Sequence, residues 1–171
     1  MMNRILLIAV LTLTLGGCVL YPTTRDYYKP VAEQDQTPAA SMGCGYHKAK
    51  HDGLQQQYDG HTIHVYPSRD NENGITVVAV LESDNEESKL VHAEVVTESG
   101  ALMTAPSEMR LTSEYYDSDT GYRSWYEAKY PPIKVTPEQL TILVTDEQGK
   151  TLEFHFEHTI QSDIFYSSIN C

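Results

Sequence analysis

The feature that most constrains the fold of this chain is an alternation of apolar and polar residues that recurs along it. In residues 61–67, Ile63 and Val65 alternate with polar neighbours, and residues 74–82 form a continuous valine-rich run. A period of two places apolar side chains on one face of a β-strand, whereas an unbroken apolar run is typical of a central strand covered on both faces. The pattern therefore predicts strands.

Further strand signals follow at regular spacing, in residues 89–97, 101–103, 121–130, 140–145 and 150–157. The expected core positions of these segments are Val91, Ala93, Val95, Leu152, Phe154 and Phe156. Gly149 suits the left-handed turn residue of a hairpin between the last two segments. About seven short antiparallel strands with turn residues between them predict an all-β sandwich, immunoglobulin-like in architecture. The Cys…Trp…Cys spacing of true immunoglobulin domains is absent, so only the architecture is predicted.

Helix signals are weak. Thr136 and Pro137 fit an N-cap followed by a first-turn proline, which predicts one helical turn before the strand at residue 140. The polar residues 45–60 fit no single pattern.

The N-terminal residues have the composition of an export signal. Arg4 is the only charged residue before position 18, and residues 5–15 are apolar apart from two threonines. A helix that spans a bilayer needs about 20 apolar residues. The shorter run predicts a signal peptide over residues 1–17.

The end of this run, Leu15-Gly16-Gly17-Cys18, resembles the lipobox of bacterial lipoproteins. The resemblance covers only the N-terminal end of the chain. It implies cleavage before Cys18 after a diacylglyceryl group has joined its sulfur, so that acyl chains such as palmitate hold the mature protein on a membrane. The next residue is Val19 rather than the aspartate that tends to retain lipoproteins on the inner membrane. In a source with two membranes, this implies the periplasmic face of the outer membrane. The alternative is an ordinary signal peptide that happens to precede a cysteine.

The cysteine count is consistent with such an anchor. The chain has three cysteines, and lipidation of Cys18 would leave the pair Cys44 and Cys171. Outside the cytoplasm, paired cysteines usually form disulfides. We therefore predict a disulfide between Cys44 and Cys171 that joins the start of the folded domain to its end; two free thiols are the alternative.

The rest of the chain divides into two parts. Residues 18–43 have few aliphatic side chains and three prolines, which predicts a flexible tether from the lipidated cysteine. Tyr27 and Tyr28 are residues with which that tether could dock. Residues 44–171 are long enough for one β-sandwich domain with its own core.

Composition and motifs exclude several functions. The net charge is −12 and the chain has no basic cluster, so no nucleic-acid partner is expected. A nucleophile elbow, a phosphate-binding glycine loop and a Cys-x-x-Cys motif are all missing, so we predict neither enzymatic activity nor a cofactor. The class of function that remains is a binding or structural module of the cell envelope. It would contact the membrane through its lipid anchor and, in addition, an envelope protein or a glycan.

The only tryptophan marks the candidate binding surface. Trp125 alternates with Arg123 and two further charged residues, and the opposite face carries Tyr122, Tyr126, Ala128 and Tyr130. Burying several charges together is costly, so the tyrosine face is expected inside and Trp125 partly exposed. We predict that Trp125 and Arg123 bind a protein partner or a sugar ring. The alternative is a Trp125 that a loop covers or a bulge turns inward.

Histidine pairs are the candidate metal ligands. His47 and His51 are spaced to share one face of a helix, which makes a metal-binding lipoprotein the second functional hypothesis. The other pairs are His61 with His64 and His155 with His158. Residues three apart in a strand point to opposite faces, so these pairs are expected to be separate. Solvated surface histidines are the alternative for all six.

Two acidic turns, residues 70–74 and 117–121, are similar to calcium-binding loops. In each, the glycine comes one position too early, and no glutamate stands twelve positions along from Asp117. We therefore expect hairpin turns, which use the same residues for backbone reasons.

Overall fold

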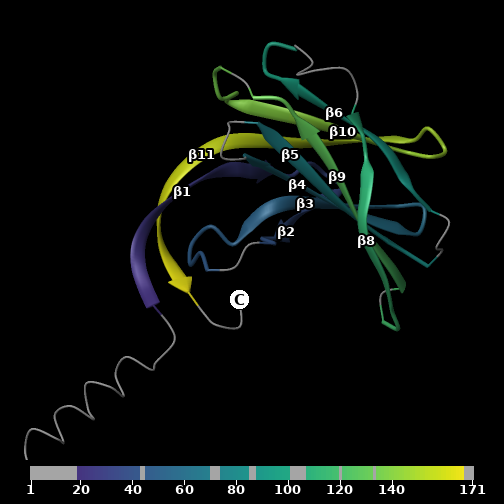
Figure 1. Ribbon diagram of the computed structural model, residues 1–171, viewed down its shortest axis with the longest axis horizontal. Coiled ribbons are helices and arrows are strands. Elements are labelled where there is room, and N and C mark those ends of the chain that lie inside the picture. The colour runs from purple at the N-terminus through teal and green to yellow at the C-terminus, as the bar shows by residue number, and fades with distance from the viewer. Residues whose placement is uncertain are drawn as a thin grey trace, which may run out of the picture.

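The computed structural model describes residues 19–42, 45–69, 74–84, 88–100, 107–119, 121–132 and 134–167. Two antiparallel sheets pack face to face as a β-sandwich (Figure 1), which confirms the predicted fold class. The described part of the chain contains no helix long and apolar enough to span a membrane.

Five strands form the first sheet: β1 (Val19–Val31), β6 (Leu90–Thr97), β7 (Ser107–Glu108), β10 (Gln139–Asp146) and β11 (Thr151–Ser167). Their order across the sheet is β1-β11-β10-β6-β7. Six strands form the second sheet: β2 (Gln36–Ala40), β3 (His51–Tyr58), β4 (His61–Arg69), β5 (Ile75–Ser83), β8 (Arg110–Asp117) and β9 (Gly121–Tyr130). Their order is β2-β3-β4-β5-β9-β8.

The described residues thus form more strands than the seven or so expected. The strands that were not expected are β1, β2, β3, β7 and β8, which come from polar or proline-containing segments without a clear apolar alternation. Residues 101–103, which were expected to form a short strand, lie outside the described residues, as do Cys18, Cys44 and Cys171.

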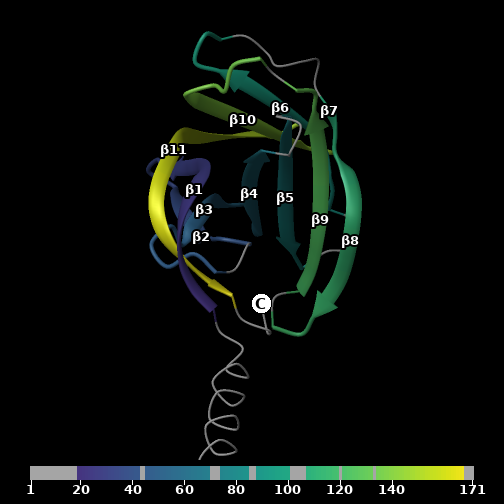
Figure 2. The ribbon, with the colours of Figure 1, turned by 60° about the vertical axis from the view of Figure 1, so that its left-hand side comes forward.

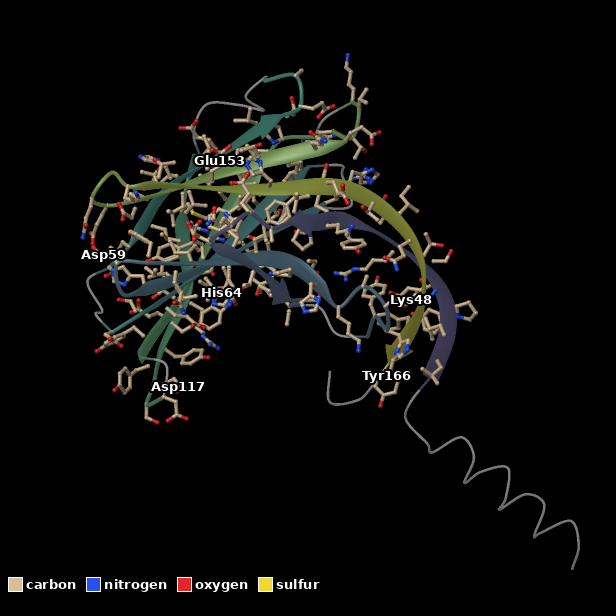
Figure 3. All side chains as sticks on the ribbon, turned by 180° about the vertical axis from the view of Figure 1, so that it is seen from behind. Lys48, Asp59, His64, Asp117, Glu153 and Tyr166 are labelled. Carbon is tan, nitrogen blue, oxygen red and sulfur yellow. The ribbon has the colours of Figure 1, made fainter. Side chains whose placement is uncertain are left out.

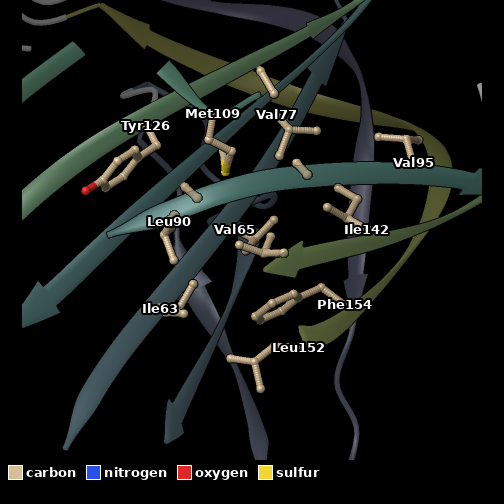
Figure 4. Packing of buried hydrophobic residues seen from close by; sticks show 14 of the residues in the cluster. Ile63, Val65, Val77, Leu90, Val95, Met109, Tyr126, Ile142, Leu152 and Phe154 are labelled. Atoms are coloured by element: carbon tan, nitrogen blue, oxygen red, sulfur yellow. The ribbon is translucent and has the colours of Figure 1, made fainter. Parts of the chain in front are cut away.

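The core lies between the two sheets (Figure 4). Phe154 and Ile142 of the first sheet and Val65 and Val77 of the second are all fully buried. Val91, which was expected in the core, is only half-buried. Thr145 pairs with His92 and Asp146 with Leu90, so Val91 is the extra residue of a β-bulge and Leu90 is buried instead.

The hairpin between β10 and β11 forms as predicted, and Gly149 occupies its turn with a φ of 81°. The predicted helical turn at residues 136–139 is wrong, because these residues bend directly into β10. The carbonyl of Pro137 instead accepts a hydrogen bond of 3.4 Å from the Tyr28 hydroxyl.

The expected flexible tether over residues 18–43 is also corrected. Residues 19–31 and 36–40 form β1 and β2, and Tyr28 is only 1% exposed in the core. Each of these strands lies at the edge of its sheet, where proline is tolerated because one side of the strand needs no backbone donor. The prolines that suggested disorder therefore mark edge strands.

A buried arginine fixes this N-terminal segment to the domain. The Arg25 guanidinium is paired with the Asp52 carboxylate and donates a hydrogen bond of 3.1 Å to the Ser41 hydroxyl. It also lies over the rings of Tyr27 and Tyr46, 4.5 and 4.4 Å from their centroids. The two charges are thus paired, and β1 is held against the loop before β3.

That loop is itself held by a buried carboxylate. Asp163 accepts hydrogen bonds from the backbone N–H groups of His47, Lys48, Ala49 and Ile164 at 2.7–3.1 Å. Burial alone would raise the pKa of Asp163, but the four N–H groups outweigh it and hold the pKa at about 2. Asp163 is therefore ionised at neutral pH.

Candidate binding surface

Strand alternation in β9 decides where Trp125 lies. Tyr126, Ala128 and Tyr130 are buried between the sheets, as predicted, whereas Tyr122 near the start of the strand is only half-buried. Trp125 and Arg123 lie half-buried on the outer face. The inner face is fixed further by the Tyr130 hydroxyl, which donates a hydrogen bond of 2.7 Å to the carbonyl of Ala93 in the opposite sheet.

The register of the six-stranded sheet brings residues of four strands to Trp125. In the row of Trp125, β5 contributes Val80 and β4 contributes His64. In the row of Arg123, β5 contributes Glu82 and β8 contributes Tyr115. Paired residues in neighbouring strands share a face, so these side chains all stand on the outer surface of the sheet.

Two aromatic rings stack at the centre of this group. The indole of Trp125 and the phenol ring of Tyr115 lie with centroids 5.1 Å apart and planes inclined by 30°. The guanidinium of Arg123 lies 6.0 Å from the Trp125 centroid and donates a hydrogen bond of 3.2 Å to the Tyr115 hydroxyl. The pair therefore presents a broad aromatic surface with a cation at its side.

Glu82 neutralises that cation. Its carboxylate accepts a charge-assisted hydrogen bond from Arg123, and its Oε1 lies 3.4 Å from the Nε2 of His64. Burial lowers the pKa of His64, and the nearby Glu82 opposes this only in part. At neutral pH, His64 is thus uncharged, and Arg123 and Glu82 form one compensated pair.

A shallow hollow of about 180 Å³ adjoins the aromatic pair. Its lining comprises Met42, His64, Tyr66, Val80, Glu82, Arg123 and Trp125. Tyr66 lies across Gly53 so closely that a Cβ atom at that glycine would collide with the ring. We define the Trp125 surface as Trp125, Tyr115, Arg123, Glu82 and this hollow.

The edge of the sheet adjoins the Trp125 surface. β8 is the last strand of its sheet, and all its residues except Asp117 are exposed. Leu111 and Tyr116, which is 65% exposed, pair with Tyr126 and Tyr122, so they stand on the other face of the strand. Exposed edge strands offer unpaired backbone groups to a further strand.

The residues predicted to bind metal lie elsewhere. Residues 47–50 form bends and loop, and His51 begins β3, so His47 and His51 share no helical face. Both are exposed. Among the described residues, no three His, Cys, Asp or Glu side chains are grouped so as to hold a metal ion.

The remaining histidines follow the expected strand geometry. In β4, His64 stands on the outer face, whereas His61 is on the inner side, near Ser88. His155 and His158 likewise stand on opposite faces of β11. The ring of His158 is hydrogen-bonded to Asp26 at 2.7 Å, and the ring of His155 lies near Thr141. Figure 3 shows His64 on the same side of the molecule as Asp117, well away from Lys48 and Tyr166.

The side chain of Asp117 in the acidic turn bonds to the backbone of the turn. The Oδ1 of Asp117 accepts a hydrogen bond of 2.7 Å from the N–H of Asp119, and Gly121 has a φ of 75° beside the carbonyl of Ser83. These are features of a hairpin turn. Residues 70–73 of the other acidic turn lie outside the described residues.

Sequence reasoning singled out Trp125 and Arg123 but missed Tyr115, Glu82 and Tyr66, and it considered His64 only as a member of a histidine pair. Alternation identifies which residues of one strand share a face, but the register that joins four strands is set by tertiary pairing. Comparison with protein-family models, curated proteins and solved structures found no match, so the function of this chain is inferred from its own residues.

Proposed function

We propose that the protein is a lipid-anchored binding module of the bacterial cell envelope, with the Trp125 surface as its recognition site. The observation that carries this proposal is the stacked pair of Trp125 and Tyr115 beside the charge-compensated Arg123. Tryptophan, tyrosine and arginine are the residues most enriched at the energetic centres of interfaces. The absence of catalytic signatures in the sequence favours binding over catalysis.

The anchor is supported by the composition of residues 1–18 and by the position of β1. An acyl-bearing Cys18 would precede β1 directly, since the strand begins at Val19. The domain would then sit close to the lipid surface, without the spacer that the sequence had predicted. If the source has two membranes, Val19 after the cysteine favours the periplasmic face of the outer membrane as the location of the anchored protein.

The disulfide between Cys44 and Cys171 is part of the proposal. Tyr46 forms an antiparallel bridge with Phe165, and the N–H of Tyr166 donates to the carbonyl of Gly45 at 2.5 Å. Cys44 directly precedes Gly45, and Cys171 follows Tyr166 by five residues, so this contact lies close in sequence to both cysteines.

We infer that the partner is an envelope protein. The hollow of about 180 Å³ is smaller than the roughly 300–1,000 Å³ of sites that enclose a drug-sized ligand, so it suits one inserted side chain. The exposed edge of β8 extends the contact area and offers backbone groups to an added strand. A single sugar ring on the aromatic pair is the second candidate, because the hollow also has room for one ring beside Arg123 and Glu82.

The test is photocrosslinking in cells that produce the full chain. A benzophenone amino acid at Ser113, which is exposed and pairs with Trp125 on the same face of the sheet, is expected to give a protein adduct that mass spectrometry identifies. The same probe at Val135, which is 79% exposed in the loop before β10, is the matched control. Equal adducts from both sites would overturn the proposed surface.

The glycan candidate has its own readout. Soluble envelope glycans should change the emission of Trp125 in the purified protein only if a sugar ring stacks near the indole. A saturable change, together with no specific protein adduct at Ser113, would replace the protein partner with a glycan.

A further inference from the structure

β1 and β11 continue beyond the rest of the sandwich as a two-stranded arm. β10 pairs with β11 only up to Glu157, whereas β1 pairs with β11 as far as Ser167. Residues 19–25 and 161–167 therefore form a curved ribbon that Figures 1 and 2 show reaching away from the other strands. The described chain begins at the tip of this arm.

One face of the arm is turned toward the domain. Phe165 is half-buried and packs against Tyr21 and Tyr46, with ring centroids 5.2 and 5.3 Å away, while Tyr21 at the tip stays 45% exposed. Further along the same face, Asp163 is buried against the loop before β3, and Arg25 is buried beside Asp52 of β3. This face holds the arm in place.

The opposite face is open to solvent and apolar. Leu20 pairs with Tyr166, and Pro22 pairs with Ile164, so the four side chains share one surface. Leu20 is 65%, Ile164 41% and Tyr166 40% exposed, and Pro22 is exposed as well. We call these four residues the apolar face of the arm.

This surface lacks charge in a chain of net charge −12. The next pair on the same face, Thr24 and Ser162, is uncharged. At the rim, the ammonium of Lys48 donates to the carbonyl of Ser162 at 3.3 Å, which places a cation beside the apolar side chains. Aliphatic side chains with a tyrosine and a lysine at the border are typical of segments that lie in a membrane interface.

The chain segment that precedes the arm indicates what lies against its apolar face. Residues 1–18 end where β1 begins, and Cys18 stands two positions before Leu20. An acyl group there would bring the lipid surface to the tip of the arm.

We propose that the apolar face of the arm lies against the membrane, so that the domain is seated on the lipid rather than suspended from it. The inference rests on the proposed anchor at Cys18. The arm would add apolar contact to that of the acyl chains and would fix the orientation of the sandwich.

The test uses the full, acylated chain in vesicles of phosphatidylethanolamine and phosphatidylglycerol whose acyl chains carry bromine, a contact quencher of tryptophan. Trp125→Phe removes the native indole, and Ile164→Trp places a new one on the apolar face. Phe165→Trp is the matched control, because Phe165 follows Ile164 in β11 but is half-buried against Tyr21 and Tyr46 on the face turned toward the domain. Leu111→Trp reports on β8, on the other sheet.

The emission of Ile164→Trp should fall by about half, because apolar faces of this kind enter the interface by roughly 5–10 Å. Phe165→Trp should be quenched less although it neighbours Ile164, and Leu111→Trp should be unaffected. Equal quenching at positions 164 and 165, or none at either while the protein floats with the vesicles, would overturn the seated arm and leave the anchor intact. Crosslinks between Ile164 and a second chain in place of quenching would also overturn it. A Cys18 without acyl groups by mass spectrometry would overturn the anchor and this inference together.

Discussion

Trp125 and Tyr115 stack on the outer face of the six-stranded sheet although they are not opposite each other in the ladder. Tyr115 pairs with Arg123, and Trp125 pairs with Ser113, so the two rings meet across the diagonal of β8 and β9. Arg123 lies next to both rings and holds the Tyr115 hydroxyl. The pair is therefore built into the surface before any partner arrives.

This arrangement predicts a modest cost for removing the indole. Trp125→Ala should lower the free energy of unfolding by about 1 to 2 kcal/mol, because a half-buried ring and one aromatic contact are lost. Tyr126→Ala, its neighbour in the core, should cost about 3 to 5 kcal/mol. Urea denaturation followed by circular dichroism measures both. Equal losses would mean that Trp125 is a core residue.

His64 should make stability depend on pH. Its pKa in the folded protein lies below the ordinary value of 6.5 because of burial, so the unfolded chain binds the proton at a higher pH. Stability is thus complete above about pH 6.5 and falls as the pH drops below that value. His64→Gln should flatten the loss between pH 7 and pH 5, whereas His51→Gln, at an exposed site, should not. An unchanged slope in His64→Gln would contradict this assignment.

Asp163 should also make stability fall as the pH drops, but in a more acidic range. Its pKa is about 2, below its ordinary value of 3.8, so its contribution to stability is present above about pH 3.8 and is lost as the pH falls toward 2. Asp163→Asn should lower the Tm by several degrees at pH 7, and the difference from the unaltered protein should shrink near pH 2. Thermal melting checks this, with Asp119→Asn as an exposed control. A difference of the same size at both pH values would contradict the prediction.

The proposed disulfide can be counted directly. The purified mature protein should show no thiol that reacts without reduction, and Cys44→Ser should expose one. Reduction should lower stability by about 4 to 5 kcal/mol, the chain-entropy value for a loop of more than 100 residues, less any strain that the bond releases. Two reactive thiols in the unreduced protein would rule the bond out.

The parts of the fold that the sequence predicted are those where one face of a strand meets the core. β9 is the clearest case, since its tyrosines and Ala128 alternate with charged residues that cannot be buried together. The burial of Val91 was predicted wrongly, because a bulge changes the face on which an alternating residue lies. No local pattern marks a bulge of that kind.

The N-terminal strands were missed for a different reason. Pro22, Pro30 and the lack of aliphatic residues indicated a tether, but β1 is an edge strand that one long partner, β11, orders along its whole length. Its contacts depend on Arg25 and Tyr28, whose partners lie far away in the sequence. Such long-range pairing cannot be read from the segment itself.

Only part of the candidate surface could be predicted, because the rest depends on pairing between strands. Trp125 and Arg123 follow from alternation within β9, while Glu82 and Tyr115 join them only through the register of neighbouring strands.

The most direct test of the Trp125 surface is the yield of the Ser113 crosslink in cells when Trp125 is replaced by alanine. The full chain carries the benzophenone at Ser113 throughout, and Val135→Ala, at an exposed apolar residue in the loop before β10, serves as the control variant. If the Trp125 surface is the recognition site, Trp125→Ala loses most of the adduct while the protein remains folded and at its normal level, and Val135→Ala retains it. An adduct as strong in Trp125→Ala as in the unaltered protein would contradict the account.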